Sequence, residues 1–275
     1  MGGRTLDPTQ PRQDTGINIR MSSEAKDETS TQGATGEPYE DLPFVLVEKV
    51  VDPYIVGFHE PQGFRAEQIR GLRNKLLVMN PDNTPRSLAI TSALQGEGKT
   101  VTSINLAIAF AELEDHKVIL LDFDLRKPSV EPFLGLNPSP GLSELLLGGA
   151  SLSDVLRPSG IEGLDIIGAG LQGLAPSELL QSRRIDELLS HLKQDYSYLL
   201  LDTPPALPIT DAGALGRKCD GTLLVVGLEK SPRKLVREAL TNLEEQGSNV
   251  LGCFVMGIRG ADPSSDARYR YPLID

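Results

Sequence analysis

Residues 91–100 read TSALQGEGKT, a stretch with two glycines followed by a lysine and a threonine. An apolar run, SLAITSA at 87–93, leads into it, and a helical pattern follows from Lys99 to about Glu114. A glycine-containing turn between a strand and a helix aims backbone N–H groups and the helix N-terminus at phosphate groups. The lysine adds a cation, and the threonine hydroxyl adds a ligand for Mg²⁺. The alternative is an ordinary turn that ends in a lysine.

We interpret this turn as a P-loop that binds ATP. Glycines at 96 and 98 would let phosphates approach the backbone closely, and the lysine would contact the β- and γ-phosphates. The first glycine of the usual pattern is replaced by Ala93, so the match fails at one position. The predicted nucleotide-binding residues are Gly96, Glu97, Gly98, Lys99, Thr100 and Val101.

A second apolar run ends in charged side chains. ILLDFDLRKP at 119–128 follows the P-loop after one helix and one turn, so its strand would be the next one of a βαβ unit. Residues two apart in a strand share a face, which would direct Asp122, Asp124 and Arg126 together toward the phosphates. One acid would orient or deprotonate a nucleophile while the other holds the water shell of the metal. The alternative is a strand that runs into an acidic surface loop.

A third apolar run, YLLLDTPPA at 198–206, has the form of a Walker B strand. Its terminal carboxylate, Asp202, would hold Mg²⁺ through water, and the prolines would stiffen the turn near the γ-phosphate. The candidate catalytic residues are Lys99, Asp122, Asp124 and Arg126, and the candidate metal ligands are Thr100, Asp124 and Asp202.

The remaining pattern predicts the fold class. Further apolar runs lie at 163–169, 221–228 and 249–258, with amphipathic helices between most of them. Near-continuous aliphatic strands separated by helices indicate a doubly wound α/β fold with a mainly parallel sheet and helices on both faces. Apolar residues at helical spacing predict one more helix over 65–79, before the first strand.

The chain divides into three predicted parts. Residues 1–43 contain few large apolar side chains, which predicts a disordered arm. Residues 44–258 form the predicted P-loop domain, and the apolar segment that opens it, up to residue 61, is expected to lie against the domain or a neighbouring subunit. Residues 259–275, RGADPSSDARYRYPLID, are polar and turn-rich, which predicts a flexible tail.

Composition limits the classes of function. At 275 residues and 39% hydrophobic, the chain can bury one sizeable core. A net charge of -11 disfavours electrostatic capture of nucleic acid or anionic lipid. The two cysteines lie in apolar segments, which fits a reducing compartment. No apolar run approaches the roughly 18 residues that span a bilayer, so we expect a soluble cytoplasmic protein that reaches the inner membrane only through a partner.

Together these motifs resemble the bacterial tyrosine kinases (BY-kinases), the autokinases of polysaccharide export systems, which are related to ParA/MinD-type ATPases. The resemblance covers roughly residues 60–258 and depends more on the two acidic strands than on the P-loop. It implies a P-loop NTPase fold, with Asp122 or Asp124 as the base toward a tyrosine hydroxyl. Asp211 and Asp220 stand where the family has similar acidic residues. The implied ATP–Mg²⁺ site consists of Lys99, Thr100, Asp122, Asp124 and Asp202.

The resemblance also implies a homo-oligomeric ring, a separate membrane-embedded activator of the polysaccharide co-polymerase type, and a cognate tyrosine phosphatase. EQIRGLR supplies Glu67, Arg70 and Arg73, which match the pattern that joins subunits in this family. The alternative is a solvated helix face with weak ion pairs. The tail supplies Tyr269 and Tyr271 as phosphoacceptors, but relatives carry a longer tyrosine run, and two tyrosines in a polar tail can be incidental.

Three positions depart from the related patterns. Gln95 stands where the family commonly has proline, and Met256 stands where an asparagine would contact adenine. Met256 and the sparse tyrosines leave open a nucleotide-binding regulator without kinase activity. A ParA/MinD-like ATPase switch is the other alternative, but its additional P-loop lysine is Leu94 here, which favours the kinase.

Overall fold

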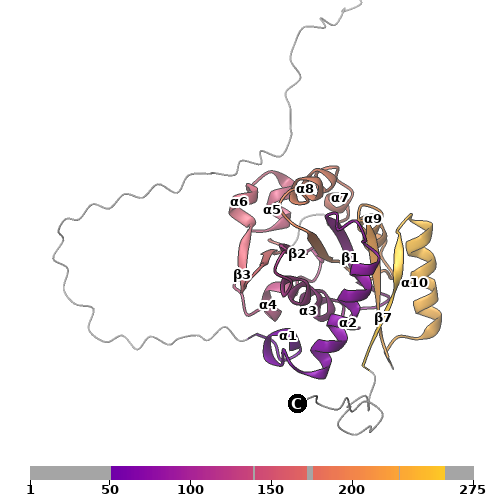
Figure 1. The fold of residues 1–275 in the computed structure, drawn as a ribbon. Coiled ribbons are helices and arrows are strands. Elements are labelled where there is room, and N and C mark those ends of the chain that lie inside the picture. The colour runs from indigo at the N-terminus through magenta and orange to yellow at the C-terminus, as the bar shows by residue number, and fades with distance from the viewer. Residues whose placement is uncertain (1–50, 139, 172–175, 229, 258–275) are drawn as a thin grey trace, which may run out of the picture.

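The protein is described by a computed structural model, in which the sheet and its covering helices form one body (Figure 1). The predicted arm and the predicted tail, with Tyr269 and Tyr271, lie outside the described residues. No helix within the described ranges combines the length and the apolar character needed to cross a membrane. The structure describes residues 51–138, 140–171, 176–228 and 230–257.

A seven-stranded sheet forms the centre of the fold, in the order β3-β4-β2-β5-β1-β6-β7. Every pairing between described strands is parallel except that of β3 with β4. The predicted doubly wound, mainly parallel α/β fold is therefore confirmed. The strands are β1 Arg86–Ser92, β2 Val118–Asp122, β3 Arg157–Ile161, β4 Leu164–Ile167, β5 Tyr198–Asp202, β6 Gly221–Gly227 and β7 Val250–Met256.

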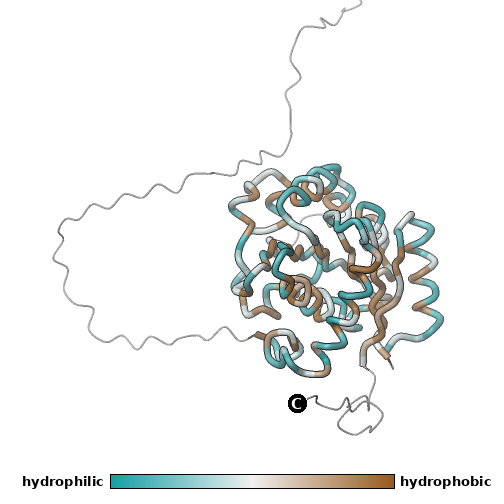
Figure 2. The backbone as a smooth tube through the Cα atoms, viewed as in Figure 1, coloured by the Kyte–Doolittle hydropathy of each residue, from teal (hydrophilic) through white to brown (hydrophobic). Residues whose placement is uncertain are grey.

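Helices cover both faces of this sheet. The helices α1 to α4 pack on one face, and α5 to α10 pack on the other. In Figure 2 the central strands are largely brown and the outer helices carry much teal, as expected for a sheet buried on both faces. The helices are α1 Val56–His59, α2 Phe64–Val78, α3 Lys99–Ala111, α4 Val130–Phe133, α5 Leu142–Leu147, α6 Leu152–Val155, α7 Pro176–Leu180, α8 Arg184–Leu192, α9 Asp211–Gly216 and α10 Arg233–Glu245.

The core follows the two-residue alternation of a strand. In β5, Tyr198 and Leu200 join the core beneath α2 and α3, whereas Leu199 and Leu201 join the core on the opposite face. All four side chains are at most 1% exposed. The strand that carries Asp202 is thereby fixed from both sides.

The segment before α2 packs on the domain, as its apolar residues predicted. Val51, Ile55 and Val56 are buried, and the backbone N–H of Gly57 donates to Asn105 Oδ1 at 2.9 Å. Asn105 belongs to α3, the helix that begins at the P-loop. The described part of this segment therefore braces the P-loop helix.

Two details of the fold differ from the sequence-based expectation. The antiparallel strand β3 was not predicted, because its sequence RPSGI contains a proline and a glycine and lacks an aliphatic run. The predicted helix at 65–79 begins and ends one residue earlier, at Phe64 and Val78.

The alternative of a solvated helix face on α2 is wrong for Arg73. Arg73 is buried rather than solvated, and its guanidinium donates to the carbonyl of Ala109 at 2.7 Å and reaches Glu112 at 3.3 Å. Arg70 donates to both carboxylate oxygens of Glu112, at 2.6 and 2.7 Å, while Glu67 stays 59% exposed. Carboxylates hold the pKa of Arg70 above its usual value, with Glu112 first, against the effect of burial. Both arginines thus tie α2 to the C-terminal end of α3.

Shortening a core side chain of β5 should lower the stability of the folded protein. Leu200→Ala removes a fully buried side chain from β5 and is expected to lower the free energy of unfolding by about 2–5 kcal/mol. Urea denaturation followed by circular dichroism measures this change. Val78→Ala is the control, because Val78 is 80% exposed and its loss should leave the midpoint unchanged. Equal effects of the two substitutions would contradict the described core.

Candidate active site

The turn between β1 and α3 has the geometry of the predicted P-loop. Gly96 and Gly98 have φ values of 80° and 98°, in the left-handed region that favours glycine. Gly98 is the N-cap of α3, so the unpaired N–H groups of the first helical turn, including that of Val101, face the turn. Ala93 is fully buried and its φ is not positive, so the turn does not require the missing first glycine. Gln95 is exposed, so the missing proline leaves no gap in the core.

The side chain of Glu97 points away from the position expected for a ligand. It is buried and accepts hydrogen bonds from the N–H of Leu94 at 2.9 Å and from Ser231 Oγ at 2.5 Å. Ser231 Oγ accepts in turn from the N–H of Gly227, at the end of β6. Glu97 therefore braces the turn with its side chain, and its backbone N–H is the group available to a phosphate.

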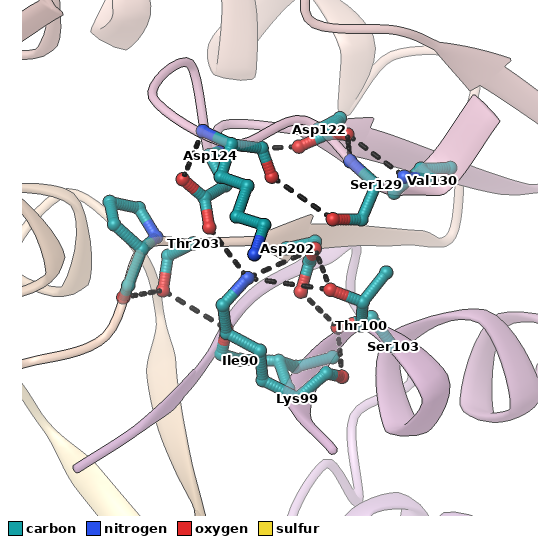
Figure 3. Close-up of polar contacts among 12 residues, drawn as sticks. Ile90, Lys99, Thr100, Ser103, Asp122, Asp124, Ser129, Val130, Asp202 and Thr203 are labelled. Atoms are coloured by element: carbon teal, nitrogen blue, oxygen red, sulfur yellow. Dashed lines mark hydrogen bonds and ion pairs between the residues drawn. The ribbon is translucent and has the colours of Figure 1, made fainter. Parts of the chain in front are cut away.

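Lys99 lies between two carboxylates (Figure 3). Its Nζ is 2.8 Å from Asp124 Oδ2 and 3.5 Å from Asp202 Oδ2, and its side chain is 7% exposed. Burial lowers the pKa of Lys99, but the charges of Asp202, Asp124 and Asp122 outweigh it, so the pKa stands above its usual value. The site therefore holds a charged ammonium group between acids.

The sheet topology brings these acids together. Strand β5 lies between β1 and β2, with Asp122 paired to Asp202 and Ile90 paired to Asp202. The P-loop that follows β1 and both acidic strand ends therefore meet at one edge of the sheet. Ends of three strands from distant parts of the sequence meet there, as predicted.

Asp202 is tied to the start of α3. It is fully buried, and it accepts hydrogen bonds from Thr100 Oγ1 at 2.7 Å and from Ser103 Oγ at 3.0 Å. Burial raises the pKa of Asp202, against the opposing effects of Lys99 and the two hydroxyls. Ser103 was not among the predicted site residues, although its position four residues after Lys99 places both on one side of a helix.

Asp122 organises the loop that follows β2. Its Oδ1 accepts from the N–H of Asp124 at 3.1 Å, and its Oδ2 accepts from the N–H groups of Ser129 and Val130 at 2.9 and 3.0 Å. Its side chain is fully buried. Burial, followed by the charge of Asp202, raises the pKa of Asp122 to about 7 despite these hydrogen bonds.

The expectation that Arg126 points the same way as Asp122 and Asp124 is wrong. Strand β2 ends at Asp122, so the two-residue alternation does not continue to Arg126. The guanidinium instead contacts Asp211 Oδ2 at 2.9 Å and Ser177 Oγ at 2.7 Å. Asp211 is buried at the start of α9, so Arg126 ties the loop to α7 and α9 and does not share the contacts of Lys99.

The side chain of Met256 packs against the P-loop helix. Its Sδ accepts from Thr102 Oγ1 at 2.9 Å, and a Cβ atom built on Gly98 would lie 2.9 Å from the same sulfur. The position implied for a base-contacting asparagine thus holds an apolar side chain beside the first turn of α3.

The oxygen atoms around Lys99 suit Mg²⁺ that enters with a nucleotide. In the part of the chain that the structure describes, no group of three His, Cys, Asp or Glu side chains is arranged to hold a metal ion alone. Mg²⁺ is usually bound by one or two carboxylates together with substrate phosphates and water. Thr100, Asp124 and Asp202 provide a hydroxyl and two carboxylates of this kind. The residues therefore fit a metal bound jointly with ATP.

Comparisons with known proteins agree with this geometry. A family described as AAA domain matches residues 86–244. The chain is 34% identical over 203 residues to tyrosine-protein kinase YwqD of Bacillus subtilis, which covers 74% of this chain and 85% of that protein. It is 31% identical over 212 residues to putative tyrosine-protein kinase CapB of Staphylococcus aureus, covering 77% and 92%.

Solved structures that resemble this chain also include a tyrosine kinase domain. The kinase domain of the Escherichia coli tyrosine kinase Etk superposes with a TM-score of 0.71 at 32% identity, covering 74% of this chain and 80% of that one. The whole Etk protein is longer, and the match covers 28% of it. MinD of Pyrococcus horikoshii, solved with Mg-ADP, superposes with a TM-score of 0.54 at 26% identity, covering 62% and 70%.

The raised pKa of Asp122 makes stability depend on pH. The folded protein keeps the proton of Asp122 up to about pH 7, whereas an unfolded chain releases it near its usual value. Between these values the folded state binds more protons, so stability present at low pH is lost as the pH rises through about 7. Thermal melting without nucleotide or Mg²⁺ should show the melting temperature falling from pH 5 to 8, roughly the range around that pKa.

Asp122→Asn removes this titration and should flatten the decrease. Asp165→Asn is a control, since Asp165 is a carboxylate of β4 outside the site. An identical pH slope in the wild-type protein and in Asp122→Asn would contradict the assignment.

Proposed function

The chain belongs to the bacterial tyrosine-protein kinases, and we propose that it is an ATP- and Mg²⁺-dependent autokinase that phosphorylates Tyr269 and Tyr271 on neighbouring subunits. One observation carries this proposal. The ammonium of Lys99 lies 2.8 Å from Asp124 and 3.5 Å from Asp202, beside the Thr100 hydroxyl. A cation for phosphate, oxygen ligands for a metal and a carboxylate base are thereby gathered in one site.

Binding of the nucleotide would use the backbone as well as Lys99. The backbone N–H groups of the P-loop and of the first turn of α3 would donate to the phosphates. The Lys99 ammonium would leave a carboxylate and contact a phosphate oxygen. Thr100 and Asp202 would hold Mg²⁺, directly and through water, with Asp124 beside them. Mg²⁺, when bound, neutralises negative charge on the β- and γ-phosphates.

Asp124 is better placed than Asp122 to serve as the base. Both oxygens of Asp122 already accept backbone hydrogen bonds in the closed loop after β2. Asp124 accepts one backbone hydrogen bond at Oδ1, from the N–H of Lys127 at 3.1 Å, whereas its Oδ2 is held by Lys99, which the phosphates would draw away. The tyrosine oxygen would then attack the γ-phosphorus, the bond to the β–γ bridging oxygen would break, and Asp124 would take the hydroxyl proton.

The same acids would help to release the product. Each phosphotyrosine carries about -1.5 to -2 charges, and the site contains Asp122, Asp124 and Asp202. Repulsion between like charges would expel the phosphorylated tail. This release offers a route from phosphorylation to disassembly of the oligomer.

Two other functions remain as alternatives. The MinD similarity supports an ATPase switch without kinase chemistry, but Leu94 at the position of the additional lysine disfavours it. Met256 beside the P-loop helix favours a nucleotide-binding regulator that has lost the kinase reaction. Nucleotide binding without phosphotyrosine would select the regulator.

The wider organisation is proposed on the same basis. The kinase domain would span 44–258 and include the assembly helix at 65–79, with a disordered arm at 1–43 and a flexible, tyrosine-containing tail at 259–275. The proposed partners are a separate, membrane-embedded activator of the polysaccharide co-polymerase type and a tyrosine phosphatase that would reverse the reaction. Nucleic acid would not be a partner. The enzyme would act in polysaccharide synthesis or export from a cytoplasmic position at the inner membrane.

The kinase proposal is tested by mapping phosphotyrosine. Purified protein incubated with Mg-ATP should gain phosphate at Tyr269 and Tyr271, as read by mass spectrometry. Lys99→Met removes the buried ammonium and should lower labelling by at least about 100-fold, a loss of roughly 3 kcal/mol in transition-state stabilisation. Lys117→Met is the control, because Lys117 is exposed and immediately precedes β2, at the opposite edge of the sheet. Equal labelling of Lys99→Met and wild type would refute the proposal.

Assembly through α2 is tested by sedimentation. We expect the wild-type protein to form a homo-oligomeric ring, and Glu67→Ala and Arg70→Ala to shift it toward monomers. Glu67→Ala is the more specific test of assembly, because the exposed carboxylate of Glu67 contributes little to the stability of the fold. Lys75→Ala removes an exposed charge from the same helix and should leave the sedimentation profile unchanged. Wild-type assembly by both Glu67→Ala and Arg70→Ala would contradict assembly through this face of α2.

A further inference from the structure

A basic cluster lies at the start of α10, beside the P-loop but outside the acidic site around Lys99. It consists of Lys230, Arg233, Lys234 and Arg237, and all four residues are exposed. The ion pairs within the described part of the chain include none of them. Such a concentration of cations is unexpected in a chain with a net charge of -11.

This basic cluster is placed unfavourably for the helix itself. The N-terminus of a helix carries partial positive charge and is stabilised by acids, but the first turn of α10 contains no acidic residue. Arg233 and Arg237 are four residues apart, so they lie on one side of the helix, and their like charges repel each other. Glu238 lies four residues after Lys234 and can offset its charge, but no acidic residue of α10 lies three or four positions from Arg233 or Arg237. An anion bound there would relieve both repulsions.

The chain leaves the domain beside this cluster. The carbonyl of Met256, the last residue of β7, accepts a hydrogen bond at 2.8 Å from the N–H of Leu228, which is two residues before Lys230. Tyr269 follows Gly257 by twelve residues. A flexible segment of that length has a typical end-to-end distance of about 20 Å, so it can reach a cluster that spans about 6 Å of helix.

Charge decides which state of the tail fits the cluster. Residues 258–275 contain three arginines and three aspartates, so the side chains of the unmodified segment carry no net charge. Phosphate on Tyr269 and Tyr271 would bring the segment to about -3 to -4. Arginine and lysine bind phosphate oxygens through strong charge-assisted hydrogen bonds.

We infer that the basic cluster of α10 is the docking surface for the phosphorylated C-terminal segment of this chain. The inference rests on the proposed phosphorylation of Tyr269 and Tyr271. Lys230 Nζ is 3.4 Å from the carbonyl of Gly96, so the docked segment would lie beside the P-loop and outside the acidic site. The acids around Lys99 expel the phosphotyrosine, and the cluster retains it, while an unmodified tail stays free to enter a neighbouring site.

Synthetic peptides test the inference independently of the kinase reaction. A labelled peptide of residues 262–275, with phosphotyrosine at both positions or unmodified, is titrated into full-length Lys99→Met protein, and fluorescence anisotropy is recorded. The phosphopeptide should bind at least about tenfold more tightly than the unmodified peptide, and the preference should weaken with added salt. ADP should not displace it.

Substitutions in the basic cluster test whether it is the surface that binds the phosphopeptide. Lys234→Glu and Arg237→Glu, each in the Lys99→Met background, should lower phosphopeptide affinity at least about tenfold. Arg183→Glu is the matched control, because Arg183 is an exposed arginine at the N-cap of α8. Lys234→Gln repeats the test with a smaller change, and thermal melting verifies that each variant is folded.

Several results would overturn the inference. Equal binding of the two peptides, or unchanged binding in both cluster variants, removes the cluster as a phosphotyrosine dock. Displacement by ADP would place the phosphate in the P-loop. Retention of phosphatidylserine vesicles by the cluster, without any preference for the phosphopeptide, would assign it to a lipid surface. Because the peptides are synthetic, failure of the autokinase proposal is seen separately, as absence of phosphotyrosine after incubation with Mg-ATP.

Discussion

The structure depends on one buried ammonium group held between carboxylates. Lys99 is the positive charge among Asp122, Asp124 and Asp202, all of which are at most 4% exposed. Three acids cannot all stay ionised around one cation away from water, which is why burial and mutual repulsion raise the pKa of Asp122 and Asp202. A metal ion would supply the missing positive charge, and a nucleotide would give Lys99 a new partner. This arrangement of charges is thus electrostatically suited to Mg-ATP.

The fold makes this arrangement possible through strand order. Placing β5 between β1 and β2 brings the P-loop and both acidic ends to one edge, although Asp202 lies 103 residues after Lys99 in the chain. Helix α3 then has a contact at each end. Its first turn meets Asp202 through Thr100 and Ser103, and its last turn meets Arg70 and Arg73 through Glu112 and Ala109. A partner that binds α2 would therefore act on the helix that would hold the phosphates, which connects proposed assembly to proposed nucleotide binding.

The sequence predicted the parts of the site that follow from regular structure. Lys99, Asp124 and Asp202 were found because a strand, a glycine turn and a helix repeat in a fixed order, and parallel strands end at one edge. The predicted direction of the Arg126 side chain was wrong because no local signal in the sequence shows that β2 ends at Asp122. The backbone N–H groups of Ser129 and Val130 donate to the Asp122 carboxylate there and close a turn.

Other features depend on contacts that are distant in sequence. The burial of Arg73 depends on Glu112, and the bracing role of Glu97 depends on Ser231, so neither has a signal in its own segment. The most direct test of the central claim is a crystal structure with Mg²⁺ and a non-hydrolysable ATP analogue. We expect Lys99 Nζ on a phosphate oxygen, with the metal between Thr100, Asp202 and the β- and γ-phosphates. A bound nucleotide that leaves the 2.8 Å contact of Lys99 with Asp124 intact and its phosphates away from both acids would contradict the account.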